Sequence, residues 1–260
     1  MNGAFLAGVG VIAPGLTSWQ QAAEVLQGSA PYVPAPVGAV QSELLPPNER
    51  RRAPLGVRMA LRAAQEATAT LGSPTDLASV FASSDADIEI IHRISMALAE
   101  PSRSVSPTDF HNSVHNAAAG YWSIGTRARG PSTALSAYDF NLAAGLNEAL
   151  ALLKFDDTDV LLVLYDVPVP PPLFSARPIS QPVAVALLLT RACAQPLASL
   201  SLCTASTEST LQDPQLEALR RGNPAAGALP LLEALARRRP AEIGVRAYDD
   251  RCIGVRIDTP

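Results

Sequence analysis

The chain has 260 residues, with 24 Asp and Glu against 20 Lys and Arg, giving a formal net charge of −4. This mild acidity excludes a broad cationic surface for nucleic acid or anionic lipid, and 48% apolar residues exclude a disordered chain. No uninterrupted apolar run is long enough to span a membrane, and the apolar N-terminus lacks the basic start of a signal peptide. We therefore expect a cytoplasmic protein.

The first part of the chain alternates short apolar runs with stretches of helical spacing. Short apolar runs bounded by turn residues are typical of strands buried on both faces. Their alternation with helices predicts an α/β fold with a mostly parallel sheet between helices. The expected strands are Ala4–Ala13, Leu77–Ala82, Thr133–Ala137, Val160–Tyr165 and Val183–Thr190. The expected helices are one that ends at Leu26 and is capped by Thr17 or Ser18, then Pro54–Leu71, Ile88–Leu98, Asn112–Thr126 and Leu142–Leu153.

The last part of the chain has a different pattern. We expect residues 193–260 to form a small α+β extension that completes the same domain as residues 1–192. Its final two apolar runs are joined by Asp249-Asp250, which is typical of a closing hairpin. The expected elements are a strand at Leu197–Leu202, helices at Asp213–Arg221 and Leu229–Arg239, and hairpin strands at Ile243–Ala247 and Cys252–Ile257.

Gly8-Val9-Gly10 follows the start of the first expected strand and suggests a dinucleotide-binding turn. The third glycine of such a turn would fall at Ala13, Pro14 follows immediately, and the expected acidic residue on a second strand is not evident. Close packing of a central strand explains the two glycines better. We expect no cofactor.

A metal site has little support in the sequence. His111 and His115 are four residues apart and Asp109 is near, but Asn112 stands where the glutamate of an HExxH motif would be. Structural roles are favoured for both histidines, and we expect no metal. The cysteines form no CxxC pair, so neither a disulfide framework nor a zinc knuckle is expected; they are Cys193, Cys203 and Cys252.

The stretch Gly130–Ala137 is the most informative. A Gly-Pro turn leads into a short apolar strand, then Tyr138-Asp139-Phe140, then a small-residue helix over Asn141–Leu150. Such a junction presents one side chain at a helix N-terminus, where a thiolate is activated or an oxyanion is bound. Here the presented residue is Asp139, whose carboxylate is a poor acyl nucleophile and could serve only as a helix cap.

With this junction the chain resembles the β-ketoacyl synthases of the thiolase superfamily. It is most similar to the short chain length factors of aryl polyene and xanthomonadin-type pigment clusters. The resemblance spans nearly the whole chain and implies a single thiolase-like half of βαβαβαββ type. It is carried by GVGVIAPG (8–15), LLPPNERRRAPLGVRMALRAAQEA (44–67), NPAAGALPLLEALARRRP (223–240) and, most specifically, SPTDFHNSVHNAAAGYWSIGTRARGPSTALSAYDF (106–140).

The departures from the family pattern bear on catalysis. An active synthase carries its cysteine ten positions along from the Gly-Pro, which is Asp139 here, and two histidines or a His/Asn pair in its second half. The last histidine of this chain is His115. The resemblance therefore implies a non-catalytic subunit that pairs with a catalytic β-ketoacyl synthase in a type II heterodimer and meets the acyl carrier protein only indirectly.

Family dimers pair their elbow-leading strands across a twofold axis, and a lone half leaves a strand edge and an apolar helix face uncovered. The resemblance implies that residues near this strand stabilise the synthase and shape its acyl tunnel. For the three aromatic residues, core or interface packing is the alternative. The implied set is Trp122, Ser132, Thr133, Leu135, Ala137, Tyr138, Asp139 and Phe140.

Two other functions remain open at this point. One is an acyl-thioester decarboxylase or hydrolase that uses Asp139 with His111 or His115. The other is a self-contained acyl-binding regulatory homodimer. Arg50-Arg51-Arg52 could bind phosphate or an acidic partner such as a carrier protein, or could form a solvated helix face.

Overall fold

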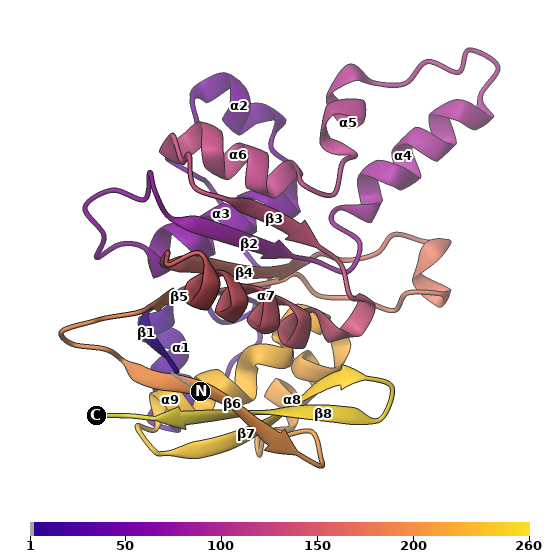
Figure 1. The fold of residues 1–260 in the computed structure, drawn as a ribbon. Helices are drawn as coiled ribbons and strands as arrows, with labels where there is room; N and C mark the ends of the chain where they lie inside the picture. The colour runs from indigo at the N-terminus through magenta and orange to yellow at the C-terminus, as the bar shows by residue number, and fades with distance from the viewer. Residues whose placement is uncertain (1–2) are drawn as a thin grey trace.

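The computed structural model describes residues 3–260, so the first two residues of the expected 1–192 domain lie outside it. One eight-stranded sheet runs through the molecule in the order β3-β2-β4-β5-β1-β6-β8-β7 (Figure 1). The strands are β1 (Ala4–Ile12), β2 (Ala78–Ala82), β3 (Ser132–Leu135), β4 (Val160–Asp166), β5 (Val183–Thr190), β6 (Ala198–Ala205), β7 (Ala241–Tyr248) and β8 (Arg251–Asp258).

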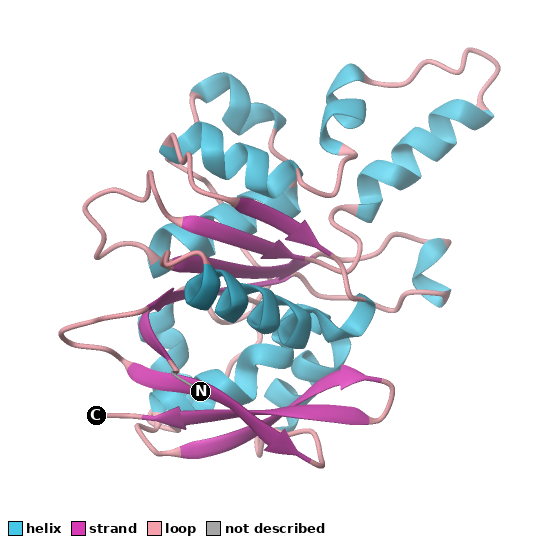
Figure 2. Cartoon of the chain, in the orientation of Figure 1, coloured by secondary structure: helices cyan, strands magenta, loops and turns pink. Residues whose placement is uncertain are grey.

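Helices cover both faces of the sheet (Figure 2). Among residues 3–260, no helix combines the length and the apolarity that a membrane span needs. The α-helices are α1 (Trp19–Leu26), α2 (Pro47–Arg52), α3 (Leu55–Ala67), α4 (Ile88–Ala99), α5 (Pro107–Asn112), α6 (Ala117–Thr126), α7 (Asn141–Phe155), α8 (Pro214–Gly222) and α9 (Leu229–Ala236), and the 3₁₀ helices are η1 (Tyr138–Phe140), η2 (Leu173–Ser175) and η3 (Pro224–Ala228).

The α/β class is confirmed, but the sheet is mixed rather than mostly parallel. Only the β3–β2 and β2–β4 pairs are parallel; the other neighbouring pairs are antiparallel. The connections explain the difference, because parallel neighbours need a long crossover that is usually helical. Between β4 and β5 the chain forms only the three-residue η2, so it turns back and β5 runs antiparallel to β4.

The central strands are buried on both faces, as their continuous apolar runs predict. In β4, Val160, Leu162 and Leu164 pack into one apolar cluster with α7, whereas Leu161 and Val163 pack into a second cluster with α3 and α6. The opposite side of α7 contacts β7. Figure 1 accordingly shows α7 between the β3–β2–β4–β5 part of the sheet and the β6–β8–β7 part. The C-terminal strands thus cover a helix that a lone half-domain would leave open.

The two glycines of β1 bring α3 close to the sheet. A Cβ atom added to Gly8 would lie 2.0 Å from the carbonyl oxygen of Ala67, and one added to Gly10 would lie 2.0 Å from that of Ala63. Real Cβ atoms essentially never approach a backbone oxygen so closely, so only glycine permits this helix–strand distance. The interpretation of the glycine pair as a packing device is confirmed.

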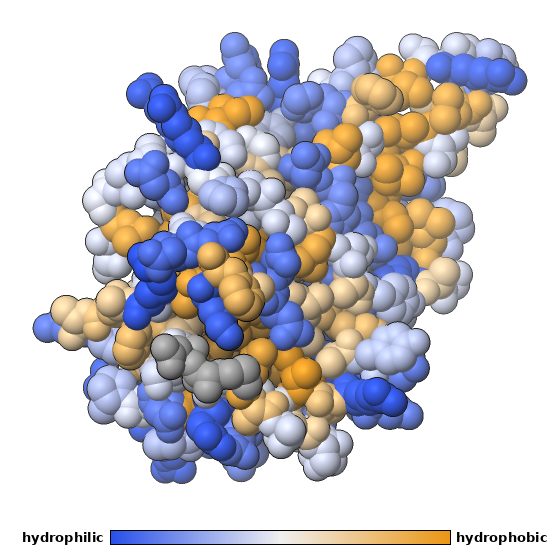
Figure 3. All heavy atoms as spheres, in the orientation of Figure 1, coloured by the Kyte–Doolittle hydropathy of each residue, from blue (hydrophilic) through white to orange (hydrophobic). Residues whose placement is uncertain are grey.

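Helices α4 and α5 project from the body of the molecule as an arm, which we call the α4–α5 arm (residues 88–114; Figures 1 and 2). Only Ile90 of α4 is buried. Met96 and Leu98 of α4 are 54% and 52% exposed, and Phe110 of α5 is 71% exposed. Figure 3 shows hydrophobic residues gathered over the arm. Soluble monomers rarely leave so many large apolar side chains together in water, which indicates an interaction surface.

Candidate functional site

The junction between β3 and α7 forms a sharp elbow. β3 ends at Leu135, and Tyr138 adopts φ 55° before α7 begins at Asn141. Positive φ is uncommon for a bulky residue and often marks a functional turn. The sequence assigned the presented position to Asp139. The structure places the strained backbone one residue earlier, and the Tyr138 side chain is 54% exposed.

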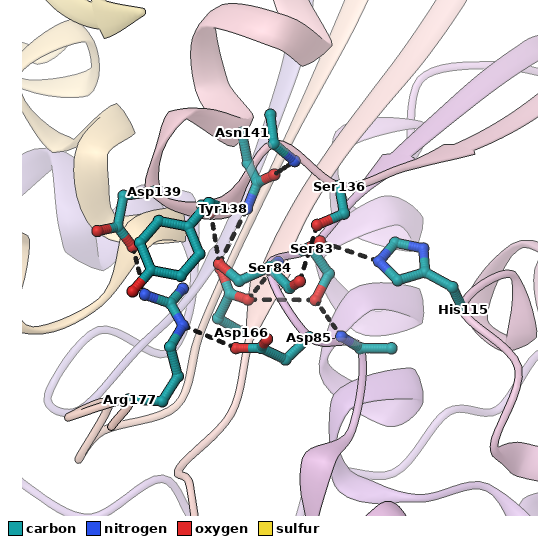
Figure 4. A network of polar contacts seen from close by, with 12 residues as sticks. Ser83, Ser84, Asp85, His115, Ser136, Tyr138, Asp139, Asn141, Asp166 and Arg177 are labelled. Atoms are coloured by element: carbon teal, nitrogen blue, oxygen red, sulfur yellow. Dashed lines mark hydrogen bonds and ion pairs between the residues drawn. The ribbon is translucent and has the colours of Figure 1, made fainter. Parts of the chain in front are cut away.

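Hydrogen bonds from Ser84, which follows β2, and from Asn141, the first residue of α7, hold this elbow in place. Ser84 Oγ donates to the Tyr138 carbonyl oxygen at 2.8 Å, and Asn141 Nδ2 donates to the same oxygen at 2.8 Å (Figure 4). Asn141 Oδ1 accepts from the Ala137 amide at 2.8 Å. Because both Ser84 and Asn141 are buried, these bonds are shielded from water and fix the strained conformation.

A buried carboxyl group lies below the elbow. Asp166, at the end of β4, accepts from Ser83 Oγ at 3.1 Å and from the Ser84 amide at 2.8 Å through Oδ1. Its Oδ2 has no hydrogen-bond partner among the described residues. Burial raises the pKa of Asp166 to about 7, since the charged form loses its hydration. Asp166 thus ties β4 to the segment that holds the elbow.

This raised pKa predicts how stability depends on pH. The folded chain retains a proton on Asp166 up to about pH 7, whereas an unfolded chain releases it near the ordinary value of 3.8. The free energy of unfolding should therefore fall between about pH 4 and pH 7 and then level off. Asp166→Asn mimics the protonated form and should be more stable than the wild type at pH 8, by on the order of 4 kcal/mol, and similar to it at pH 4.

Urea unfolding at several pH values measures both profiles. Asp250→Asn, at an exposed turn position, is the matched control and should keep the wild-type profile. Parallel pH profiles for the wild type and Asp166→Asn would show that this carboxyl group does not titrate as described.

Arg177, from the connector between β4 and β5, neutralises the elbow carboxylate. Its Nε donates to Asp85 Oδ2 at 3.0 Å and its Nη1 donates to Asp139 Oδ1 at 2.6 Å. The guanidinium carbon lies 3.9 Å from the centre of the Tyr138 ring. Burial disfavours the charged guanidinium and so lowers the pKa of Arg177. The hydrogen bonds to Asp139 and Asp85 together have the opposite and larger effect, and they hold this pKa above its ordinary value. Asp139 is therefore engaged in an ion pair.

The histidines have structural contacts, as expected. His115 Nε2 lies 3.0 Å from the Ser83 carbonyl oxygen, and the His111 ring meets Tyr121 edge-on with centroids 6.1 Å apart. Figure 4 shows His115 and Asp139 on opposite sides of the Ser83–Ser84 segment. Among residues 3–260, no hydrogen bond joins either histidine to Asp139, and no group of three or more His, Cys, Asp or Glu is placed to hold a metal.

Most residues of the implied interface lie together. Ser132, Thr133 and Leu135 lie on β3 at the edge of the sheet, and residues 137–140 form the elbow. Phe140 packs under Arg246, 5.3 Å from the guanidinium carbon. Trp122 is the exception and requires a correction: it is 1% exposed on α6 inside the core, so core packing accounts for it.

The polar residues around the elbow were not predicted from the sequence, although their positions at the ends of two strands could have indicated them. Ser83-Ser84-Asp85 follows β2 directly, and Asp166 ends β4, its parallel neighbour. The carboxyl ends of neighbouring parallel strands meet at one edge of a sheet, where ligands commonly bind. No comparable signal marks Arg177, since it lies in an irregular connector.

Comparison with known proteins identifies the family. The family model described as the N-terminal domain of β-ketoacyl synthase matches residues 18–243. The chain belongs to this β-ketoacyl synthase family. The thiolase-like fold expected from the sequence is confirmed, and with it the resemblance to ketosynthases and chain length factors. No curated protein sequence matches the chain.

Solved structures of synthase-like proteins share the fold over the full length. One is described as the ketosynthase ApeO in complex with its chain length factor ApeC from Xenorhabdus doucetiae; it has 25% identity and a TM-score of 0.75 over 97% of this chain and 98% of that one. The ishigamide ketosynthase/chain length factor has 14% identity and a TM-score of 0.74, with 98% of each chain covered. A β-ketoacyl synthase from Burkholderia phymatum STM815 has 13% identity and a TM-score of 0.73 over all of both chains. The last two, at this low identity, support the fold alone.

Proposed function

We propose that this chain is a non-catalytic chain length factor that pairs with a catalytic β-ketoacyl synthase in type II polyketide or fatty-acid-like biosynthesis of the aryl polyene kind. The elbow carries the proposal. A covalent route needs a free nucleophile at this turn, whereas the turn here offers an exposed tyrosine and a carboxylate, Asp139, bound to Arg177. Cys203 and Cys252 lie on β6 and β8, away from the elbow in the chain.

The free edge of the sheet supports a synthase as the partner. β3 is one of the two outermost strands of the sheet, and Ser132 at its start is exposed. An unpaired strand edge is a template for pairing with another chain. The α4–α5 arm adds exposed apolar surface to the same molecule. One structure similar to this chain is described as a ketosynthase with its chain length factor, which is the assembly proposed here.

The proposed mechanism is steric. With β3 paired to the synthase, the exposed Tyr138 in the elbow after that strand lies near the partner and can form part of the wall of its acyl tunnel. Buried hydrogen bonds from Ser84 and Asn141 hold this wall in a fixed position. The wall therefore does not move aside when the growing acyl chain reaches it. The space beside the wall then limits how many rounds of extension the acyl chain undergoes. The acyl carrier protein docks mainly on the synthase.

Co-expression with a candidate partner β-ketoacyl synthase tests the proposal. Native mass measurement should give a stable 1:1 complex, and intact-protein mass measurement after incubation with an acyl thioester should show the acyl group on the synthase only. A synthase lacking its catalytic cysteine is the control and should abolish all loading. An acyl group attached to this chain, or a chain that stays alone in the presence of the synthase, contradicts the proposal.

A further inference from the structure

β7 is the strand at the end of the sheet opposite to β3 (Figure 1). Its free edge is covered by residues 206–211, which lie between β6 and α8 and which we call the strap. The Ser209 amide donates to the Gly244 carbonyl oxygen at 2.9 Å, and the Gly244 amide donates to Ser209 Oγ at 3.0 Å. Ser209 therefore satisfies both backbone groups of Gly244, which lies in the middle of β7.

Only glycine at position 244 lets the strap lie this close to the strand. A Cβ atom added to Gly244 would overlap the carbonyl oxygen of Thr207, which is a backbone atom of the strap. Glycine weakens a strand interior and often marks the place where another backbone approaches closely. Gly244 is thus explained by the strap that packs against it.

Ion pairs and a hydrogen bond hold the strap to α8. Glu208 Oε1 accepts from Nη1 of the buried Arg220 at 2.6 Å. The same guanidinium group donates to both carboxylate oxygens of Glu217 at 2.7 Å each. Glu217 Oε2 also accepts from the amide of Leu211, the last residue of the strap, at 3.0 Å. The strap is therefore fixed on both sides, to β7 and to α8.

The edge beneath the strap is complementary to a second copy of itself. In an antiparallel ladder, alternate residues direct their backbone groups to opposite sides, so Glu242 and Arg246 direct theirs to the free edge as Gly244 does. Two β7 strands paired antiparallel about a twofold axis at Gly244 set Glu242 of each copy opposite Arg246 of the other. Both side chains are exposed, and opposite charges that face each other across strands stabilise the pair.

We propose that the strap is an autoinhibitory contact that prevents β7 from pairing with a second copy of this chain. An uncovered strand edge is a template for association, and a twofold pair of identical edges is self-complementary. Gly244 is the centre of that pair. An incoming strand has to displace both hydrogen bonds of Ser209 and the Thr207 carbonyl group before it reaches this centre. The inference does not depend on the proposed function.

Sedimentation velocity of the full chain over a range of concentrations tests the proposal. Gly244→Ala forces the strap away from β7, whereas Ser209→Pro removes both hydrogen bonds and leaves the residues of β7 unchanged. Each variant should self-associate at least about tenfold more tightly than the wild type, because a net gain of about two hydrogen bonds corresponds to such a factor. Circular dichroism checks folding, and either variant alone suffices because the two disrupt the same contact from opposite sides.

Gly227→Ala is the matched control, since its Cβ meets no atom within 4 Å, and it should associate like the wild type. Arg246→Glu added to Gly244→Ala sets carboxylates opposite each other in the pair and should reverse most of the gain. Folded strap variants that associate no more tightly than the wild type would overturn the proposal. Association that is insensitive to Arg246→Glu would also overturn it, because the copies would then meet at another surface.

Discussion

Gly10→Ala should destabilise the folded chain by about 3 kcal/mol or more. The added Cβ would lie 2.0 Å from the carbonyl oxygen of Ala63 and 2.8 Å from its carbonyl carbon. Both are backbone atoms of α3, which packs over β1 and β5, so relief requires the helix to move off the sheet. Movement of α3 would open the cluster that contains Met59 and Leu61, both fully buried. Denaturant unfolding monitored by circular dichroism measures the loss.

Gly38→Ala is the matched control, because a Cβ at Gly38 meets no atom within 4 Å. Its free energy of unfolding should stay within about 0.5 kcal/mol of the wild type. Gly8→Ala should behave like Gly10→Ala, since its Cβ would lie equally close to the Ala67 oxygen. A Gly10→Ala protein as stable as the wild type would show that α3 is not held against β1 as described.

Ala134→Pro should abolish the proposed complex with the synthase and leave the chain itself folded. In β3, the Pro131 carbonyl accepts from the Ser79 amide at 2.9 Å and the Leu135 carbonyl from the Ser83 amide at 3.2 Å. Since backbone groups of alternate residues face alternate sides in a parallel ladder, Ala134 directs its N–H toward the free edge. Proline removes this donor and places a ring at the edge. Copurification with the synthase should fall at least about tenfold, from the lost hydrogen bond and the steric conflict together.

Ala134→Ser keeps the backbone N–H and is the control for the side-chain change; its complex should match that of the wild type. Thermal unfolding of both variants checks that the chain remains folded. If Ala134→Pro assembles as well as the wild type, β3 does not pair with the synthase, and the α4–α5 arm becomes the surface to mutate.

Much of the fold follows from short-range pattern. The expected helices Ile88–Leu98 and Leu142–Leu153 agree closely with α4 and α7, because the spacing of apolar residues along one helix is local information. α2 and α5 were not expected as separate helices, since each has only six residues, which is too short for a helical spacing of apolar residues to show. Strand direction was also missed, because it depends on which distant strands pair and not on the residues within one strand.

The sequence by itself determined the family and the packing role of Gly8 and Gly10. Each depends on residue identity at fixed spacing. The tertiary structure alone decided that Tyr138 is the strained residue, that Arg177 binds Asp139 from 38 positions away in the chain, and that Asp166 is buried enough to hold a proton near pH 7. Ion pairs and desolvation depend on distances between segments remote in sequence, which only the packed chain defines.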